Sequence, residues 1–124
     1  TTKQRTSDTI KLIQYAYNNF EIVNIKEIIN NKFEQWREIN EGRIYVNKGI
    51  KKQLELYLEE MEFETMAVEK ENVDKIDIEV NSIFYLEAPV AKHQIIGNLQ
   101  VIVNNEKIDI LNIYAIEEIR KKEM

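Results

Sequence analysis

Apolar residues recur every three or four positions in the first part of the chain, a spacing that places them on one side of an α-helix. The segment from Thr6 to Phe20 is predicted to be helical, and Ser7 or Asp8 would cap its start because a side-chain oxygen accepts hydrogen bonds from free backbone amides. A second, weaker repeat predicts a helix near 26–37, with a strand or irregular structure as the alternative. The apolar positions of the two segments are Ile10, Leu12, Ile13, Ala16, Tyr17 and Phe20, and then Ile25, Ile28, Ile29, Phe33 and Trp36.

From Arg43 onward the period changes to two, which is typical of β-strands. In KKQLELYLEEM three leucines alternate with polar residues, and each buried leucine contributes about 1.5–3 kcal/mol, so we expect a well-defined register. Asn104-Asn105 predicts a tight hairpin turn because asparagine tolerates positive φ, and Lys48-Gly49 predicts another turn. The predicted strands are RIYVN, KKQLELYLEEM, FETMAVE, DKIDIEV and the two arms of NLQVIVNNEKIDIL.

Together these elements predict a mainly β fold. We expect an antiparallel β-sandwich-like domain with an N-terminal helix, a second helix near 26–37, and a short C-terminal helix that starts near Ile116. The predicted boundary follows the first helix, so residues 1–19 would form one unit and residues 20–124 the β-rich domain.

Composition narrows the function classes. Of 124 residues, 44% are hydrophobic and 31% charged, which is typical of a folded domain. A net charge of −5 disfavours nucleic-acid binding, and the absence of cysteine excludes disulfides and thiolate metal sites. No apolar run approaches the ~18 residues of a transmembrane helix, and no signal peptide is recognised. The chain starts at Thr1 without an initiator methionine, so we expect a processed or excised segment.

Candidate chemistry is sparse. His93 is the only histidine and the only serines are Ser7 and Ser82, and no Gly-x-Ser-x-Gly or phosphate-binding glycine loop occurs. His93 is therefore interpreted as a turn or surface residue, with a catalytic base as the alternative. In EEMEFE, three glutamates would share one strand face; we expect a solvated face, with a weak divalent-cation site or an acidic catalytic site as alternatives. These residues are Glu60, Glu62 and Glu64.

One stretch, LEAPVAKHQIIGNLQV, resembles the C-terminal β-domain of serine-type D-alanyl-D-alanine carboxypeptidases, the low-molecular-mass penicillin-binding proteins that trim peptidoglycan stem peptides. Ile96 is a conservative change from the family pattern, and His93 stands where the family usually has glycine. The step Phe20-Glu21-x-Val23 is similar to the family's passage from the catalytic domain into the first β-domain strand. The matching positions are Leu86, Ala88, Pro89, Val90, Lys92, Gln94, Gly97, Leu99 and Val101.

The resemblance implies several structural features. Residues 1–19 would be the last helix of the catalytic domain. His93 would occupy a turn with positive φ, Pro89 would lead into that turn, and Gly97 would permit a bulge or a close backbone approach. Without the catalytic domain, the apolar stripe of the first helix is expected to pack on the β-domain or to self-associate with a second copy.

The resemblance also implies a function. The family's Ser-x-x-Lys, Ser-x-Asn and Lys-Thr-Gly motifs are all missing, so we assign no catalytic, cofactor-binding or metal-binding residue to this chain. The domain would position an extracytoplasmic catalytic domain of the same polypeptide relative to the membrane, or contact other cell-wall proteins. Membrane contact would come only through a segment beyond Met124, because the basic residues of RKKEM alone are too few to hold the chain. An independent β-rich adaptor is the alternative.

Overall fold

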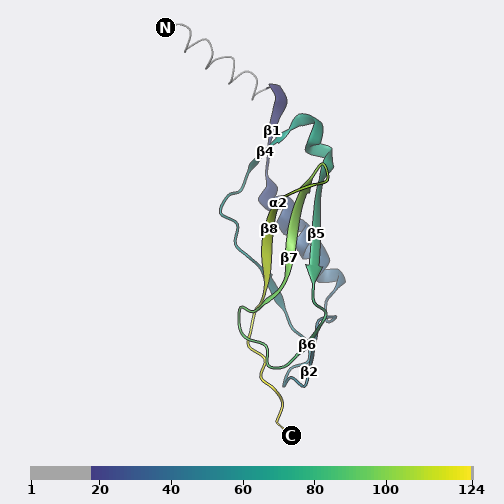
Figure 1. Ribbon diagram of the computed structural model, residues 1–124, viewed down its shortest axis with the longest axis vertical. Helices are drawn as coiled ribbons and strands as arrows, with labels where there is room; N and C mark the ends of the chain where they lie inside the picture. Colours follow the sequence, from purple (N-terminus) through teal and green to yellow (C-terminus); the bar gives the residue numbers. More distant parts are fainter. Residues whose placement is uncertain (1–17, 124) are drawn as a thin grey trace.

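The computed structural model describes residues 18–123, and most of their regular structure is β-strand (Figure 1). A single long helix lies behind the central strands, and the described part begins and ends at opposite ends of an elongated molecule (Figure 1). The elements in chain order are β1 (Phe20–Val23), α2 (Ile25–Ile39), β2 (Tyr45–Asn47), β3 (Leu56–Leu58), β4 (Met66–Glu69), the 3-10 helix η1 (Lys70–Lys75), β5 (Ile76–Ser82), β6 (Tyr85–Glu87), β7 (Ile95–Val103) and β8 (Glu106–Ala115).

The strands form one principal sheet and two short ribbons. The principal sheet is antiparallel with strand order β3-β8-β7-β5, while β1 pairs antiparallel with β4 and β2 pairs parallel with β6. The mainly β class is therefore confirmed, but the expected two-sheet sandwich is replaced by a single four-stranded sheet. The reason is length: β1, β2, β4 and β6 have only three or four residues each, too short to build a second covering sheet.

Helix α2 covers the apolar face of the principal sheet. The helix predicted near 26–37 is confirmed as Ile25–Ile39, and Asn24 caps it by accepting a hydrogen bond from the Glu27 amide at 3.1 Å. Its buried residues Ile25, Ile29 and Phe33 join the same core cluster as sheet residues. Those sheet residues are Leu56, Ile78, Leu99, Val101, Leu111, Ile113 and Ala115.

The sheet shows the predicted alternation, interrupted by register shifts at two places in the β7–β8 pairing. Leu99 and Val101 are buried, while the alternating residues Asn98 and Gln100 lie on the other face. The register shifts between Ile95 and Gly97, so two residues of β7 oppose one of β8 and Ile96 turns into the core. A Cβ at Gly97 would lie 2.1 Å from the Asn81 carbonyl oxygen, which confirms the predicted close backbone approach.

The predicted turns are also present. Asn104 and Asn105 join β7 to β8 with φ angles of 50° and 65°, as expected for a tight hairpin. Lys48 has φ of 61° and starts the turn that follows β2. The leucine face of KKQLELYLEEM also points inward, although β3 keeps only Leu56–Leu58 as strand.

The C-terminal helix predicted near Ile116 is wrong. Residues 116–123 are extended or bent, and Ile119 makes an antiparallel bridge with Val90 through two backbone hydrogen bonds of 2.8 and 2.9 Å. Ile119 is buried, whereas Ile116 is partly exposed. Burial of Ile119 and pairing of its backbone with Val90 outweigh the helical spacing of the sequence.

The predicted first helix lies almost entirely outside the described residues. Asn18 and Asn19 are helical, but Phe20 begins β1 and is not the end of the helix. A strand at the Phe20-Glu21-x-Val23 step is what the resemblance implied. The apolar stripe formed by Ile10, Leu12, Ile13 and Tyr17 lies beyond the described part, so its proposed packing stays a prediction.

Candidate functional site

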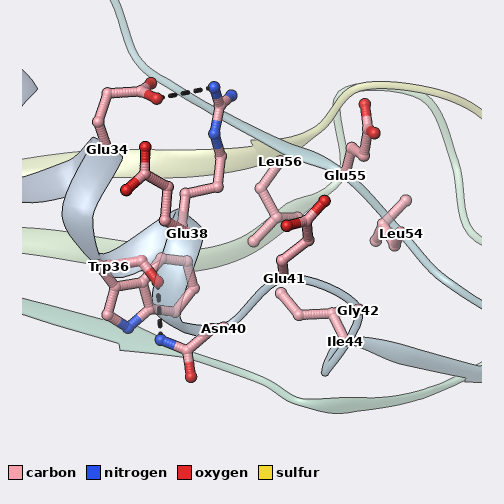
Figure 2. Close-up of a pocket in the computed structure, with 11 residues that line it drawn as sticks. Glu34, Trp36, Glu38, Asn40, Glu41, Gly42, Ile44, Leu54, Glu55 and Leu56 are labelled. Carbon is pink, nitrogen blue, oxygen red and sulfur yellow. Dashed lines mark hydrogen bonds and ion pairs between the residues drawn. The ribbon is translucent and has the colours of Figure 1, made fainter.

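One concave candidate site lies at the C-terminal end of α2. This cavity of about 300 Å³ is enclosed by the last turns of the helix, the Asn40–Gly42 turn and the chain leading into β3 (Figure 2). Asn40 holds the turn by donating from Nδ2 to the Trp36 carbonyl oxygen at 2.8 Å. The apolar part of the lining is Trp36, Ile44, Leu54 and Leu56.

Carboxylates dominate the polar part of this cavity. Arg37 donates to Glu34 Oε2 at 2.9 Å, so its guanidinium is already paired (Figure 2). The acidic lining residues are Glu34, Glu38, Glu41 and Glu55. Among the described residues that line it, no Ser, Cys, Lys or His would serve as a nucleophile or an imidazole base. The net negative charge of the lining disfavours an anionic ligand in this cavity.

His93 lies at the other candidate position, in the turn between β6 and β7. Its φ is 66°, and the turn closes where the Gln94 amide donates to the Ala91 carbonyl at 3.1 Å. The His93 amide donates to the Ala115 carbonyl at 3.0 Å, which ties the turn to the end of β8. The predicted turn position with positive φ is therefore confirmed.

The His93 imidazole contacts Tyr57. Its Nδ1 atom and the Tyr57 hydroxyl lie 2.6 Å apart, and the two rings meet edge to face with centroids 5.8 Å apart. Ser82 uses its hydroxyl on the neighbouring Ile83 carbonyl, and Ser7 lies outside the described residues. No described residue supplies an alkoxide or thiolate nucleophile beside the imidazole.

Replacing His93 by glycine should change stability by less than about 1 kcal/mol. Glycine adopts positive φ without strain, which offsets the loss of an exposed Tyr57 contact. Urea denaturation is the measurement, and Asn105→Gly at φ of 65° is the matched control with the same small change. His93→Val should cost more, since a β-branched residue fits this φ poorly. A loss above about 2 kcal/mol for His93→Gly would contradict this account.

The acidic run does not form the expected strand face. Glu60, Glu62 and Glu64 are exposed and lie in the irregular connection between β3 and β4. Within the described part of the chain, no three His, Cys, Asp or Glu side chains come together as a set of metal ligands. The structure therefore does not assemble these glutamates into a site.

Alternation on β2 and β6 creates an exposed aromatic pair that was not predicted. Tyr45 and Tyr85 stack with centroids 5.8 Å apart, and Asn47 donates to Glu87 Oε1 at 2.9 Å beside them. Partial desolvation, and then the negative charge of Glu87, raise the pKa of Tyr85 above its ordinary value. The alternation in YVN and YLE was the available signal, but parallel pairing of distant segments was not visible in it.

Comparison with known families decides the identity of the fold. The family model for the C-terminal domain of penicillin-binding protein 5 matches residues 33–121, well over half of the chain. The chain belongs to this family. The stretch from Leu86 to Val101 that carries the resemblance is the segment that runs from β6 through the His93 turn and the Gly97 bulge into β7.

Two solved structures share the fold of this penicillin-binding protein 5 C-terminal domain. Penicillin-binding protein 5 from Haemophilus influenzae has a TM-score of 0.59 and 19% identity, covering 98% of this chain and 32% of that one. The D-alanyl-D-alanine carboxypeptidase DacD from Francisella tularensis has a TM-score of 0.54 and 18% identity, covering 98% of this chain and 28% of that one. The chain thus spans less than a third of each matched structure. No curated protein matches the sequence.

Among residues 18–123, no helix combines the length and apolar character needed to cross a bilayer.

Proposed function

We propose that this chain is the non-catalytic C-terminal domain of a serine-type D-alanyl-D-alanine carboxypeptidase, which positions the catalytic domain relative to the membrane or contacts other cell-wall proteins. The family match over residues 33–121 carries the proposal. The missing Ser-x-x-Lys, Ser-x-Asn and Lys-Thr-Gly motifs support it, because that chemistry requires all three.

The shape of the domain supports a positioning role. β1 and β4 lie at one end, and the chain ends at the other (Figure 1). The nine residues of β7 alone span roughly 30 Å, and they are held on both sides by β5 and β8. A hydrogen-bonded sheet between the two ends acts as a stiff spacer, unlike a flexible linker.

The 124-residue chain should neither form a covalent adduct with labelled penicillin nor release D-alanine from a D-Ala-D-Ala peptide. The reason is the lack of a serine-lysine nucleophile pair in its sequence. Gel fluorography of the purified chain is the measurement, with an intact carboxypeptidase as the positive control. A stoichiometric labelled band on the 124-residue chain would contradict the proposal.

The positioning role is tested in the parent enzyme. Replacing residues 20–124 by a flexible Gly/Ser linker should leave kcat/KM on a soluble D-Ala-D-Ala peptide nearly unchanged. Release of D-alanine from intact, cell-attached peptidoglycan should fall several-fold, because the catalytic domain loses its fixed placement. Equal loss on both substrates would indicate damage to the catalytic domain, and no loss on either would overturn the positioning role.

An independent β-rich adaptor is the second candidate, since the domain has its own core and its own sheet. The encoding sequence upstream of Thr1 separates the two: a Ser-x-x-Lys domain supports the first proposal, and an unrelated domain supports the adaptor.

A further inference from the structure

Two segments that are distant in sequence form the pole of the molecule that carries the C-terminal residues. The turn after β2 and the C-terminal segment are joined by an isolated antiparallel bridge between Gly49 and Lys121. The Lys122 amide donates to the Lys48 carbonyl at 2.7 Å, and the Ile50 amide donates to the Arg120 carbonyl at 2.9 Å. These hydrogen bonds fix the two segments side by side.

This pairing brings two backbone segments rich in basic residues side by side. The basic tip is defined as Lys48, Lys51, Lys52, Arg120, Lys121 and Lys122. The segments 48–52 and 117–123 carry these six positive charges and three negative ones, a net of +3, whereas the whole chain carries −5. By difference the rest of the chain carries −8, so positive charge is concentrated in these two segments.

Most of this positive charge has no acidic partner within residues 18–123. Lys51 pairs with Glu117 at 2.5 Å and Arg120 lies 3.9 Å from Glu118. The four remaining tip lysines are exposed and form no ion pair with a described residue: Lys48, Lys52, Lys121 and Lys122.

An exposed apolar residue lies between two of these lysines in the sequence. Ile50 follows the Lys48-Gly49 turn and is 64% exposed, although its backbone is held by Arg120. Ile50 lies two residues from each of the unpaired Lys48 and Lys52. An exposed isoleucine near such lysines is the combination expected of a surface that meets anionic lipid, where the charges contact headgroups and the apolar group enters the boundary below them.

We propose that the basic tip binds the anionic headgroups of a lipid bilayer directly, through residues of the folded domain. This inference rests on the proposed function, and it deepens that function by naming a lipid surface as the partner of the basic tip. Lysine suits that partner, because it is a flexible point charge that requires no fixed bidentate geometry.

A planar surface fits the charge distribution better than an extended soluble polyanion. The tip is the end of an elongated molecule, so a plane can touch it without approaching the acidic body (Figure 1). A long polyanion such as a nucleic acid would extend past the tip and meet the −8 of the remaining chain. Most of the acidic body also lies more than a Debye length, about 8 Å, from a plane that touches the tip, so its repulsion is screened.

The first experiment is co-sedimentation of the 124-residue chain with vesicles. At about 50 mM salt we expect roughly tenfold more chain on phosphatidylglycerol-rich vesicles than on phosphatidylcholine vesicles, and loss of binding at about 500 mM salt. Changing the four unpaired tip lysines to glutamine should reduce binding at least tenfold, since each near-surface lysine contributes about fivefold. The matched control changes Lys32, Lys70, Lys75 and Lys107, which are exposed elsewhere, and should retain binding.

The second experiment locates the contact. The chain has no cysteine, so a single Ile50→Cys can carry an environment-sensitive fluorophore, with Asn105→Cys in the β7–β8 hairpin as the control. We expect a blue shift on anionic vesicles for position 50 only. Equal losses for the two lysine sets, equal shifts at both positions, or binding of inorganic polyphosphate without vesicle binding would each overturn the proposal. Vesicle binding needs no catalytic domain, so its failure is distinguishable from failure of the positioning role.

Discussion

Gly97→Ala should destabilise this domain by about 3 kcal/mol or more, one of the largest effects of any single methyl group in the chain. The added Cβ would lie 2.1 Å from the Asn81 carbonyl oxygen and 2.9 Å from the Ser82 Cα, both of them backbone atoms of the neighbouring strand. Those atoms are fixed by the β5–β7 register, in which Ser82 opposes Gly97, so relief requires the two strands to separate.

Urea denaturation of Gly97→Ala is the measurement, and Gly42→Ala is the control. At Gly42 the φ is 74° and a new Cβ would meet only the flexible Gln53 side chain at 3.2 Å, so the expected cost is about 1 kcal/mol. The two changes make the same unfolded-state difference, hence the excess at Gly97 measures the backbone clash. Similar small losses at both positions would show that β5 and β7 are not held together as closely as described.

Ile119→Ala should cost about 2–5 kcal/mol, because it empties a buried position that the sequence pattern assigns to a helix. Ile119 is 1% exposed, bridges Val90, and packs so closely on Gly49 that a Cβ there would lie 2.8 Å from Ile119 Cγ2. The substitution removes the apolar contact that holds the C-terminal segment against the rest of the core.

Thermal or urea denaturation of Ile119→Ala is compared with Ile116→Ala. Ile116 is partly exposed, so its loss should cost under about 1 kcal/mol. An amphipathic helix would place the two isoleucines on one face, three residues apart, and would make the costs similar. Equal costs would therefore contradict the extended conformation of residues 116–123.

Local features were predictable because each depends on neighbouring residues in the chain. The helix near 26–37 followed from apolar spacing, and the Asn104-Asn105 hairpin followed from the tolerance of asparagine for positive φ. The turn at His93 and the close approach at Gly97 followed from the resemblance to the carboxypeptidase family, since glycine positions in a family indicate unusual backbone geometry.

The candidate sites depended on more distant contacts. The α2 cavity combines residues 34–42 with residues 44–56, and its acidic lining was not visible as a motif. The exposed Tyr45–Tyr85 pair requires parallel pairing of β2 with β6, forty residues apart. The histidine was correctly interpreted as a turn residue, but its Tyr57 partner comes from a strand far from it in sequence.

The sequence by itself determined the β-rich class, the position of the helix, the two tight turns and the absence of a serine-lysine catalytic pair, because periodicity, backbone preference and residue type are local properties. Only the tertiary structure decided that residues 116–123 are extended and that Lys48 lies beside Lys122. Helical spacing at Ile116 and Ile119 is a weak local preference, and burial of Ile119 with backbone pairing to Val90 outweighs it. Arg120, Lys121 and Lys122 thereby lie beside a second basic segment, residues 48–52.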